Sequence, residues 1–437
     1  MSEERVAPRR LLPQEEAVLE ANRCLQCEDA PCVRACPADV DVPGFIDRLR
    51  TGNLRAAGRF LRQANIFGDT CGLVCPVSQL CEGACMATKL SYPIMIGCLQ
   101  HYVAHHTADH PVPVPEPARN APAVAVVGAG PGGLSAARAL ALSGLRVEVF
   151  EAEPELGGLL LRGIPAYRLP TEVARRESTL ASLGLTVRME TALGRDVTLE
   201  ELGQRFAATV LAVGVGGAAE LAIPGEHLKG VGNALSFIAR ARRGEVTQVP
   251  EEVVVVGGGN VAADAAMTAR ELGARDVFLL YRRSFLQMPA WSMERNAALT
   301  EGVHVLVLTV PLEFIGDDQG RLQAVRCGHT TLGEPDATGR RRPDVLEGSL
   351  YTIRAQMALL ALGQRVDSDV RRALPGVEFG EWGRVLIDEA GMTTVAGVFA
   401  CGDFANGGGT VVQAVGEGKA VAQAVIRHLG REKEPQS

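Results

Sequence analysis

The feature that most constrains the fold is a strand, turn and helix pattern between Val124 and Glu151. A short apolar run leads into a G-x-G-x-x-G turn, an Ala/Leu-rich helix follows, and a second strand ends on the acid. Glycines let the backbone approach a pyrophosphate at a helix N-terminus, and the acid accepts hydrogen bonds from a ribose. We therefore predict a βαβ dinucleotide-binding unit. Its candidate contacts are Gly128, Gly130, Gly132, Gly133 and Glu151.

A second stretch repeats this architecture but ends differently. Val253 to Val256 leads into a glycine turn and a helix, and the next strand, Asp276 to Leu280, is followed by a tyrosine and two arginines instead of an acid. Arginines accommodate a 2′-phosphate, to which they can bond bidentately. The pattern predicts FAD at the first unit and NADP(H) at the second, the alternative being that the arginines are surface residues. Candidate NADPH contacts are Gly257, Gly259, Asn260, Val261, Arg282 and Arg283.

Near the C-terminus a buried strand pattern ends at Cys401-Gly402-Asp403, before a glycine turn and a helix from about Thr410. An aspartate in this place can bind the sugar-like chain of a flavin, and a helix N-terminus stabilises negative charge on the reduced ring. The further candidate FAD contacts are Gly158, Asp403, Thr410 and Val411.

Nine of the eleven cysteines lie between Cys24 and Cys98, in a chain too long for a small disulfide scaffold. The first run ends in Cys-Pro, as in bacterial ferredoxins, and thiolates suit iron–sulfur clusters or zinc. Zinc is the alternative, but structural zinc sites usually show paired C-x2-C knuckles and only one occurs here. Eight thiols match two [4Fe–4S] clusters. These are Cys24, Cys27, Cys32, Cys36, Cys71, Cys75, Cys81 and Cys85.

Three further groups of basic residues are expected to be ordinary surface. The arginines between the cysteine runs could form a docking helix, but a solvated face is the simpler reading. A histidine group could offer a metal pair at His101 and His105, but it lacks a carboxylate, so we expect surface histidines. An arginine triplet is expected at a solvated hairpin tip. The groups are Arg48, Arg50, Arg55, Arg59 and Arg62; His101, His105, His106 and His110; and Arg340, Arg341 and Arg342.

Bulk properties exclude several function classes. The net charge of −7 argues against nucleic acid or an anionic membrane as the main partner. No apolar run approaches the roughly 18 residues of a spanning helix, and no signal core follows Met1. We expect a soluble, cytoplasmic protein. A proline-rich stretch after His110 predicts a domain boundary.

Together these motifs resemble the small (beta) subunit of glutamate synthase and the N-terminal half of dihydropyrimidine dehydrogenase, over about residues 23–428. The resemblance also rests on Gly333-Glu-Pro-Asp336 and Tyr281-Arg-Arg-Ser284. It implies an α/β fold with two Rossmann-like domains, pyridine nucleotide-disulfide oxidoreductase-like, after a helical iron–sulfur domain. The implied domains are 1–118 for the clusters, 119–223 with 364–437 for FAD, and an inserted 224–363 for NADPH.

The resemblance also implies that cluster ligands cross between the two cysteine runs. Cys24, Cys27 and Cys32 would share a cluster with Cys85. Cys36, Cys75 and Cys81 would share one with Gln100, whereas spacing alone favours Cys71. Glutamate synthase small subunits typically carry Glu where this chain has Gln100, which tilts the interpretation toward dihydropyrimidine dehydrogenase. A second departure is Gln287, where relatives often have Glu.

The implied activity is FAD-dependent NAD(P)H oxidation, with electrons leaving through the clusters to a large catalytic subunit or a ferredoxin-like carrier. The cofactors carry the chemistry, so no catalytic side chain is named. A thioredoxin-reductase-like enzyme would need a redox Cys-x-x-Cys after residue 98, and none exists. A carrier subunit that does not itself oxidise NADPH, and a self-sufficient reductase, stay open.

Overall fold

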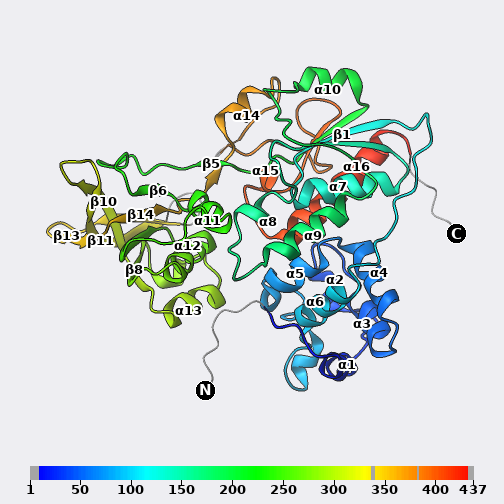
Figure 1. Ribbon diagram of the computed structural model, residues 1–437, viewed down its shortest axis with the longest axis horizontal. Coiled ribbons are helices and arrows are strands. Elements are labelled where there is room, and N and C mark those ends of the chain that lie inside the picture. Colours follow the sequence, from blue (N-terminus) through cyan, green and yellow to red (C-terminus); the bar gives the residue numbers. More distant parts are fainter. Residues whose placement is uncertain (1–8, 336–339, 381–382, 432–437) are drawn as a thin grey trace. The chain divides into compact units, whose positions relative to one another are not determined.

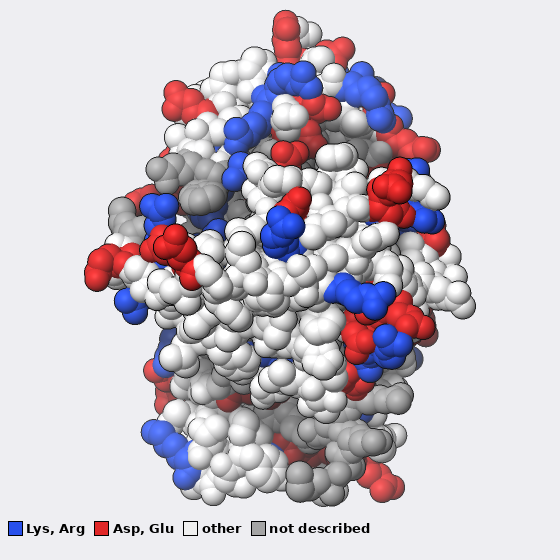
Figure 2. Space-filling view, turned by 90° about the vertical axis from the view of Figure 1, so that its left-hand side faces the viewer, with Lys and Arg blue, Asp and Glu red and all other residues white. Residues whose placement is uncertain are grey.

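A computed structural model describes residues 9–335, 340–380 and 383–431, and the chain forms two compact units (Figure 1). The larger unit comprises residues 8–160, 168–217 and 364–437. The smaller unit comprises 218–363 with 161–167. Within the described residues, no helix is long and apolar enough to cross a membrane. On the face shown in Figure 2, charges of both signs are interspersed and neither forms a continuous patch.

The N-terminal part of the larger unit is entirely helical where it is described. Its short helices are separated by the cysteine-bearing loops and pack through small apolar cores that include Phe45, Leu61 and Leu99, all fully buried. The helices are α1 Gln14–Asn22, α2 Pro31–Arg34, α3 Val42–Arg50, α4 Leu54–Ala64, α5 Gly68–Val74, η1 Val77–Gln79, η2 Met86–Lys89 and α6 Ile96–His106.

The same unit contains a five-stranded parallel sheet in the order β16-β4-β1-β2-β3. Parallel sheets are covered on both faces, which explains why the central strands are continuous apolar runs. The edge strand β16 comes from the C-terminal segment. The strands are β1 Ala123–Val127, β2 Arg146–Phe150, β3 Thr186–Arg188, β4 Ala208–Leu211 and β16 Val398–Ala400.

Helices flank this sheet, and two of them matter for the site. Helix α7 (Pro131–Leu142) begins at the first glycine turn. Helix α16 (Val411–His428), the last helix among the described residues, packs against α7. The other elements of this unit are α9 Thr171–Ser182, α10 Leu199–Arg205, β15 Gln364–Arg365, α14 Ser368–Arg372 and α15 Asp403–Asn406; α8 Leu159–Arg162 and β5 Gly217–Ala218 span boundaries between the units.

The smaller unit repeats the parallel topology in the order β6-β14-β7-β8-β9 and adds an antiparallel sheet of β10, β11, β12 and β13. Its elements are β6 Val231–Asn233, α11 Ala234–Arg242, β7 Glu252–Val256, α12 Asn260–Glu271, β8 Asp276–Tyr281, η3 Phe285–Gln287, α13 Ser292–Thr300, β9 His304–Val307, β10 Thr309–Gly316, β11 Leu322–Pro335, β12 Arg341–Val345, β13 Tyr351–Arg354 and β14 Met357–Leu360.

Candidate functional site

The two glycine turns have the same local geometry in the two units. Gly128 (φ +103°) and Gly257 (φ +147°) lie in a backbone region that favours glycine, and a Cβ at either would come within 2.3 Å of a carbonyl oxygen, that of Ala212 or Ala361. Gly130 is the N-cap residue of α7, and a methyl group there would meet no atom within 4 Å. Gly259 is equally open at the start of α12. Both turns therefore leave space at a helix N-terminus, which fits a dinucleotide.

Close packing accounts for the remaining glycines of the first turn. A Cβ at Gly133 would lie 1.9 Å from the carbonyl oxygen of Gly128, so only glycine lets α7 approach β1 this closely. Gly158 (φ +53°) packs against Gly130 on the other side of the turn, where a Cβ would lie 3.1 Å from the Gly130 Cα. Gly132 faces α16.

Glu151 lies directly after β2 and is buried, 5% exposed. One carboxylate oxygen accepts the Ala129 N–H at 2.7 Å and the other accepts the Glu153 N–H at 2.9 Å. These bonds hold the carboxylate against the glycine turn. Since an ionised carboxylate has about four acceptor sites, capacity remains for ribose hydroxyls.

Strand register shows what replaces this acid in the smaller unit. Val127 pairs with Phe150, and Val256 pairs with Leu280. Tyr281 therefore occupies the position equivalent to Glu151, and Arg282 follows it. Tyr281 donates from its hydroxyl to the Gln287 carbonyl at 2.6 Å, while Asn260 accepts the Trp291 N–H at 2.9 Å. Val261 is partly buried beside it in α12.

The arginines after β8 are joined to the hairpin formed by β11 and β12. Arg283 Nε donates to the Arg341 carbonyl at 2.9 Å, and the Thr330 hydroxyl donates to the Arg282 carbonyl at 2.9 Å. Desolvation lowers the pKa of Arg282, and the charges of Arg283 and Arg340 lower it further. Arg340 was expected only at a solvated tip. Arg340 is exposed, but its positive charge, like that of Arg283, lowers the pKa of Arg282.

Gln287, the departure from the related sequences, has a local structural role. Its side-chain oxygen accepts from both the backbone N–H and the hydroxyl of Ser284 and so caps η3. An amide oxygen makes these bonds without adding a negative charge beside Arg282 and Arg283.

The C-terminal flavin-type elements are held together by Glu417, a residue that the sequence did not single out. Its carboxylate accepts from the Gly402 N–H at 2.8 Å and from the Asn406 side chain at 2.8 Å. Asp403 accepts the Gly409 N–H at 3.2 Å, and burial raises the pKa of its carboxyl. Thr410 caps α16 in a capping box with Gln413, so the backbone of Val411 opens the helix.

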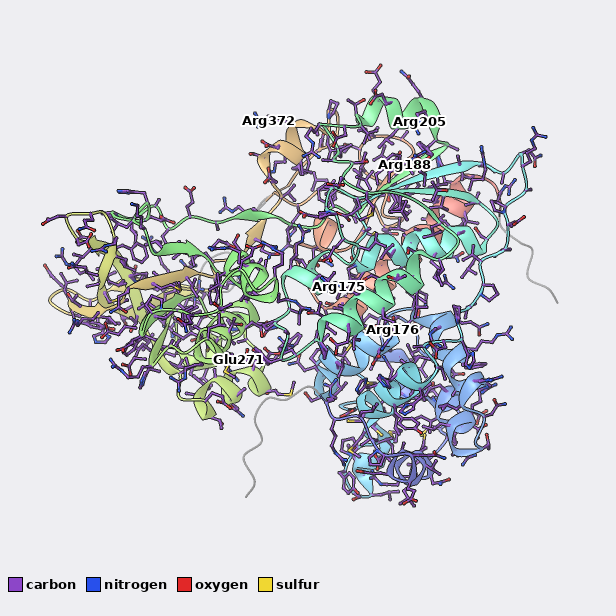
Figure 3. The ribbon with its side chains drawn as sticks, viewed as in Figure 1. Arg175, Arg176, Arg188, Arg205, Glu271 and Arg372 are labelled. Atoms are coloured by element: carbon purple, nitrogen blue, oxygen red, sulfur yellow. The ribbon has the colours of Figure 1, made fainter. Side chains whose placement is uncertain are left out.

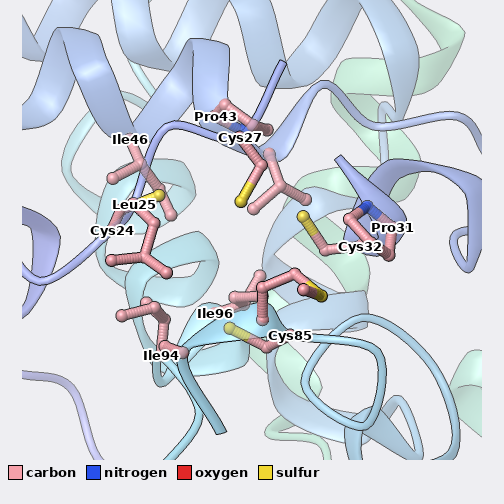
Figure 4. A pocket seen from close by; sticks show the side chains of 13 residues that line it. Cys24, Leu25, Cys27, Pro31, Cys32, Pro43, Ile46, Cys85, Ile94 and Ile96 are labelled. Atoms are coloured by element: carbon pink, nitrogen blue, oxygen red, sulfur yellow. The ribbon is translucent and has the colours of Figure 1, made fainter. Parts of the chain in front are cut away.

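Four cysteines from both runs surround one pocket. Cys24, Cys27 and Cys32 come from the first run and Cys85 from the second, and Figure 4 shows their sulfur atoms directed into a common space. Apolar side chains, including Ile46 and Ile96, form the rest of the wall. Thiols set around a space with apolar walls fit an iron–sulfur cubane. Among the described residues, no group of three His, Cys, Asp or Glu side chains could hold a single metal ion.

Burial makes these thiols hard to ionise without a counter-charge. It raises the pKa of Cys24, and it raises the pKa of Cys32 to about 12, with the charges of Cys24 and Cys85 adding to the effect. A bound cluster would supply the positive charge that favours thiolates.

A second set of cysteines lies together elsewhere in the helical part. Burial raises the pKa of Cys36, to which the charge of Cys71 contributes. Burial also raises the pKa of Cys81 to about 12, with contributions from Glu82 and Cys36. Cys71 in turn forms a side-chain hydrogen bond with Cys75, which raises its pKa. Cys36, Cys71, Cys75 and Cys81 therefore form one neighbourhood.

Gln100 and Cys71 both lie in this helical region. Gln100 is buried on α6, and its Nε2 donates to the Gly68 carbonyl at 2.8 Å, so the side-chain oxygen is the atom suited to a ligand role. Cys71 is buried on α5. Cys98, which the sequence left without a role, is partly buried, and burial raises its pKa.

The expectation of surface histidines is wrong for His101. This residue is buried, and its Nδ1 is hydrogen-bonded to Asp69, which also pairs with Arg176. Figure 3 shows Arg176 on α9, beside the helices of the N-terminal part. Next to it, Glu177 accepts the backbone N–H groups of Asp69 and Thr70 at 2.7 Å each. This buried polar network joins α5, α6 and α9.

The solvated-helix reading also fails for one arginine. Arg62 is 5% exposed and donates to the Thr107 hydroxyl and the Ala104 carbonyl, both at 2.9 Å. Arg48 lies over the Phe60 ring at 3.7 Å, and Arg50 pairs with Asp47. The basic residues are therefore used partly to join α3, α4 and α6.

Comparison with known proteins adds to this geometry. Residues 122–418 match the pyridine nucleotide-disulphide oxidoreductase family, and residues 5–112 match the 4Fe–4S cluster domain described as dihydropyrimidine dehydrogenase domain II. The NADPH-dependent glutamate synthase small chain of Azospirillum brasilense is 34% identical over 94% of this chain and 89% of its own length. The chain belongs to the pyridine nucleotide-disulphide oxidoreductase family and groups with glutamate synthase small chains.

Other relatives are longer proteins. The NADP(+)-dependent formate dehydrogenase subunit beta of Moorella thermoacetica is 35% identical over 92% of this chain, which spans only 60% of that subunit. The chain likewise spans 64% of the NADPH-Fe(3+) oxidoreductase subunit beta of Geobacter sulfurreducens. The chain thus covers about two thirds or less of several relatives.

Solved structures show the same fold. FprA from Mycobacterium tuberculosis, solved in complex with NADPH, is 20% identical, with a TM-score of 0.61 over 72% of this chain and 87% of its own. Thioredoxin reductase of T. acidophilum gives a TM-score of 0.53 at 20% identity. With the family matches, the chain is an FAD-dependent NAD(P)H oxidoreductase that carries 4Fe–4S clusters.

Proposed function

We propose that this chain is the NADPH-oxidising electron-input subunit of a larger enzyme, of the glutamate synthase small-subunit kind. Electrons would pass from NADPH through FAD and two [4Fe–4S] clusters to a partner subunit. The observation that carries this proposal is the pocket of Cys24, Cys27, Cys32 and Cys85, which lies in the same unit as the flavin-type sheet. The relatives are named "small chain" or "subunit beta", which supports the existence of a partner subunit.

FAD, when bound, accepts electron pairs from a nicotinamide and passes them on singly. The chain's own residues bind and orient the groups. The open N-termini of α7 at Gly130 and of α12 at Gly259 would bind pyrophosphates. Glu151 would bind a ribose, and Arg282 with Arg283 would bind a 2′-phosphate. Glu417 fixes the loop that carries Asp403.

A second candidate is the electron-input subunit of a dihydropyrimidine dehydrogenase. The observation in its favour is Gln100, buried beside the second cysteine set, because glutamate synthase small subunits typically carry Glu there. A self-sufficient NAD(P)H reductase that uses a ferredoxin-like carrier is a third. A disulfide reductase is disfavoured, because after Cys98 the chain holds only Cys327 and Cys401, both buried.

The decisive experiment is anaerobic purification of the untagged chain from its native host, followed by identification of co-purifying proteins. We expect a glutamate synthase large subunit, and the chain alone should reduce viologen dyes with NADPH. A pyrimidine-reducing partner would select the second candidate, and dye turnover without any partner the third. A chain that binds cofactors but does not oxidise NADPH would overturn the proposal.

A further inference from the structure

Lys419 makes an unusual connection within the larger unit. It lies on α16, yet its ammonium group donates to the carbonyl oxygens of Ala38 at 2.6 Å and Ala64 at 3.0 Å, both in the N-terminal helical part. Ala38 comes two residues after Cys36, and Ala64 ends α4. Ordering a long side chain costs conformational entropy of about 1.5–2 kcal/mol, so a lysine held at both carbonyls calls for a reason.

The backbone of α16 is itself pressed against the cysteine loop. A Cβ at Gly416 would lie 2.0 Å from the Pro37 carbonyl oxygen. On another side of the helix, a Cβ at Gly418 would lie 2.2 Å from the carbonyl oxygen of Gly132, in the first glycine turn. Glycines thus let one helix touch both the Cys36-Pro37 segment and the start of α7.

This helix also begins at the flavin-type end of the unit. Thr410 caps it beside the loop that Glu417 holds. From Val411 to Lys419 is eight residues, or roughly 12 Å at 1.5 Å per residue. The lysine therefore lies a short helical distance from the candidate flavin site, on the side where α16 meets the second cysteine set.

The charges around Lys419 are those of the cysteine loop. Burial lowers the pKa of Lys419, and the negative charges of Asp39 and Cys36 oppose that effect. Arg9, which precedes α1 in the chain, donates to the carbonyl of Gly72 in α5 at 2.6 Å and to that of Cys75, directly after α5, at 2.5 Å. A reduced cluster carries one more negative charge than an oxidised one, and nearby charge is one of the terms that set cluster potentials.

We propose that Lys419 sets the reduction potential of the cluster held by Cys36, Cys75 and Cys81, raising it so that the reduced flavin can pass electrons on. This inference rests on the proposed function. The lysine acts through its positive charge, and its two carbonyl contacts hold that charge at the Cys36 loop.

Three variants separate charge from structure: Lys419→Arg keeps the charge, Lys419→Gln keeps a hydrogen-bond donor without charge, and Lys419→Met keeps only the aliphatic length. The readout is an anaerobic redox titration of the full chain, followed by electron paramagnetic resonance of both reduced clusters. We expect Gln and Met to lower one cluster's potential, so that its reduced-to-oxidised ratio at fixed potential falls about tenfold, or about 59 mV for one electron. The other cluster and the Arg variant should match the wild type.

The control is Lys229→Met, the same loss of charge at an exposed lysine of the smaller unit. A wild-type potential in Lys419→Gln would overturn the proposal, even if Lys419→Met fails to assemble, because the lysine would then be only structural. An equal shift in Lys229→Met would also overturn it. Failure of the proposed function looks different, since the wild-type chain would then lack two cluster signals or fail to oxidise NADPH.

Discussion

We propose that one position, occupied by Glu151 after β2 and by Tyr281 at the end of β8, decides which ribose each nucleotide unit accepts. In the larger unit it is Glu151, whose buried carboxylate is already bonded to the glycine turn. In the smaller unit the equivalent position is Tyr281, and the next two residues bring positive charge. A carboxylate there would repel a 2′-phosphate, whereas guanidinium groups bond to it.

The first prediction concerns Arg282 and Arg283. Replacing both with alanine removes charge-assisted hydrogen bonds worth about 1.5–3 kcal/mol each, so kcat/KM for NADPH should fall about 100-fold or more. NADH, which has no 2′-phosphate, should be used almost as before. Steady-state dye reduction with both nucleotides measures this, and equal losses for NADPH and NADH would contradict the 2′-phosphate assignment.

Two hairpin arginines give a graded control for that test. The charge of Arg340 acts on Arg282, whereas Arg342 is exposed and pairs with Asp344 at 3.4 Å. Arg340→Ala should weaken 2′,5′-ADP binding measured by calorimetry, and Arg342→Ala should leave it unchanged. Binding of 5′-ADP should not respond to either change.

The reach of sequence reasoning at this scale follows from how local each feature is. The turn glycines and the arginines after β8 were predicted because each acts within a few residues of its neighbours. Glu417, Lys419 and the Asp69–His101 pair were missed, because their partners lie 11 to 381 residues away in the sequence. The prediction that His101 lies at the surface is wrong for the same reason, because its partner Asp69 is 32 residues away in the sequence.

At the scale of elements, α16 connects two parts of the larger unit, since it contacts both α7 and the Cys36 loop. The second prediction tests that contact. Gly416→Ala places a methyl group 2.0 Å from the Pro37 carbonyl oxygen, and overpacking of this kind typically costs about 1–3 kcal/mol. The melting temperature should therefore fall by several degrees.

The matched control is Gly203→Ala in α10, where a Cβ would meet no atom within 4 Å. Since alanine is the better helix former by about 1 kcal/mol, this variant should melt at or above the wild-type temperature. An unchanged melting temperature in Gly416→Ala would show that the helix does not approach the loop so closely.

The network between α5, α6 and α9 gives the third prediction. Burial raises the pKa of Glu177 from 4.5 to about 8, and the charge of Asp69 contributes. The folded protein then holds a proton that the unfolded chain releases above about pH 4.5, so the free energy of unfolding falls as pH rises from about 4.5 to 8. Glu177→Gln cannot titrate, and its melting temperature should lose this downward slope. Parallel pH profiles for the two proteins would contradict the assignment.

At the scale of the whole molecule, the chain order differs from the spatial order. The segment 364–437 returns to the larger unit after the smaller unit is complete and supplies β16, Asp403 and α16. The repeated strand-and-glycine pattern predicted the two parallel sheets, because buried parallel strands leave continuous apolar runs. The exact division into two compact units, with the cysteine helices and the flavin-type sheet in one of them, depends on packing that periodicity does not encode.

The fourth prediction tests whether the two sets of cysteines hold separate clusters. Cys85→Ser removes one of the four thiols around the first pocket, so bound iron should fall from about eight atoms per chain to about four, the content of one cubane cluster. Reduction of the flavin by NADPH should persist in stopped-flow traces, because the candidate nucleotide contacts lie outside this pocket. Cys98→Ser, at a thiol in the same helical part, should keep all of its iron. Complete loss of iron from Cys85→Ser would mean that the two clusters assemble together, and full retention would mean that Cys85 is not a ligand.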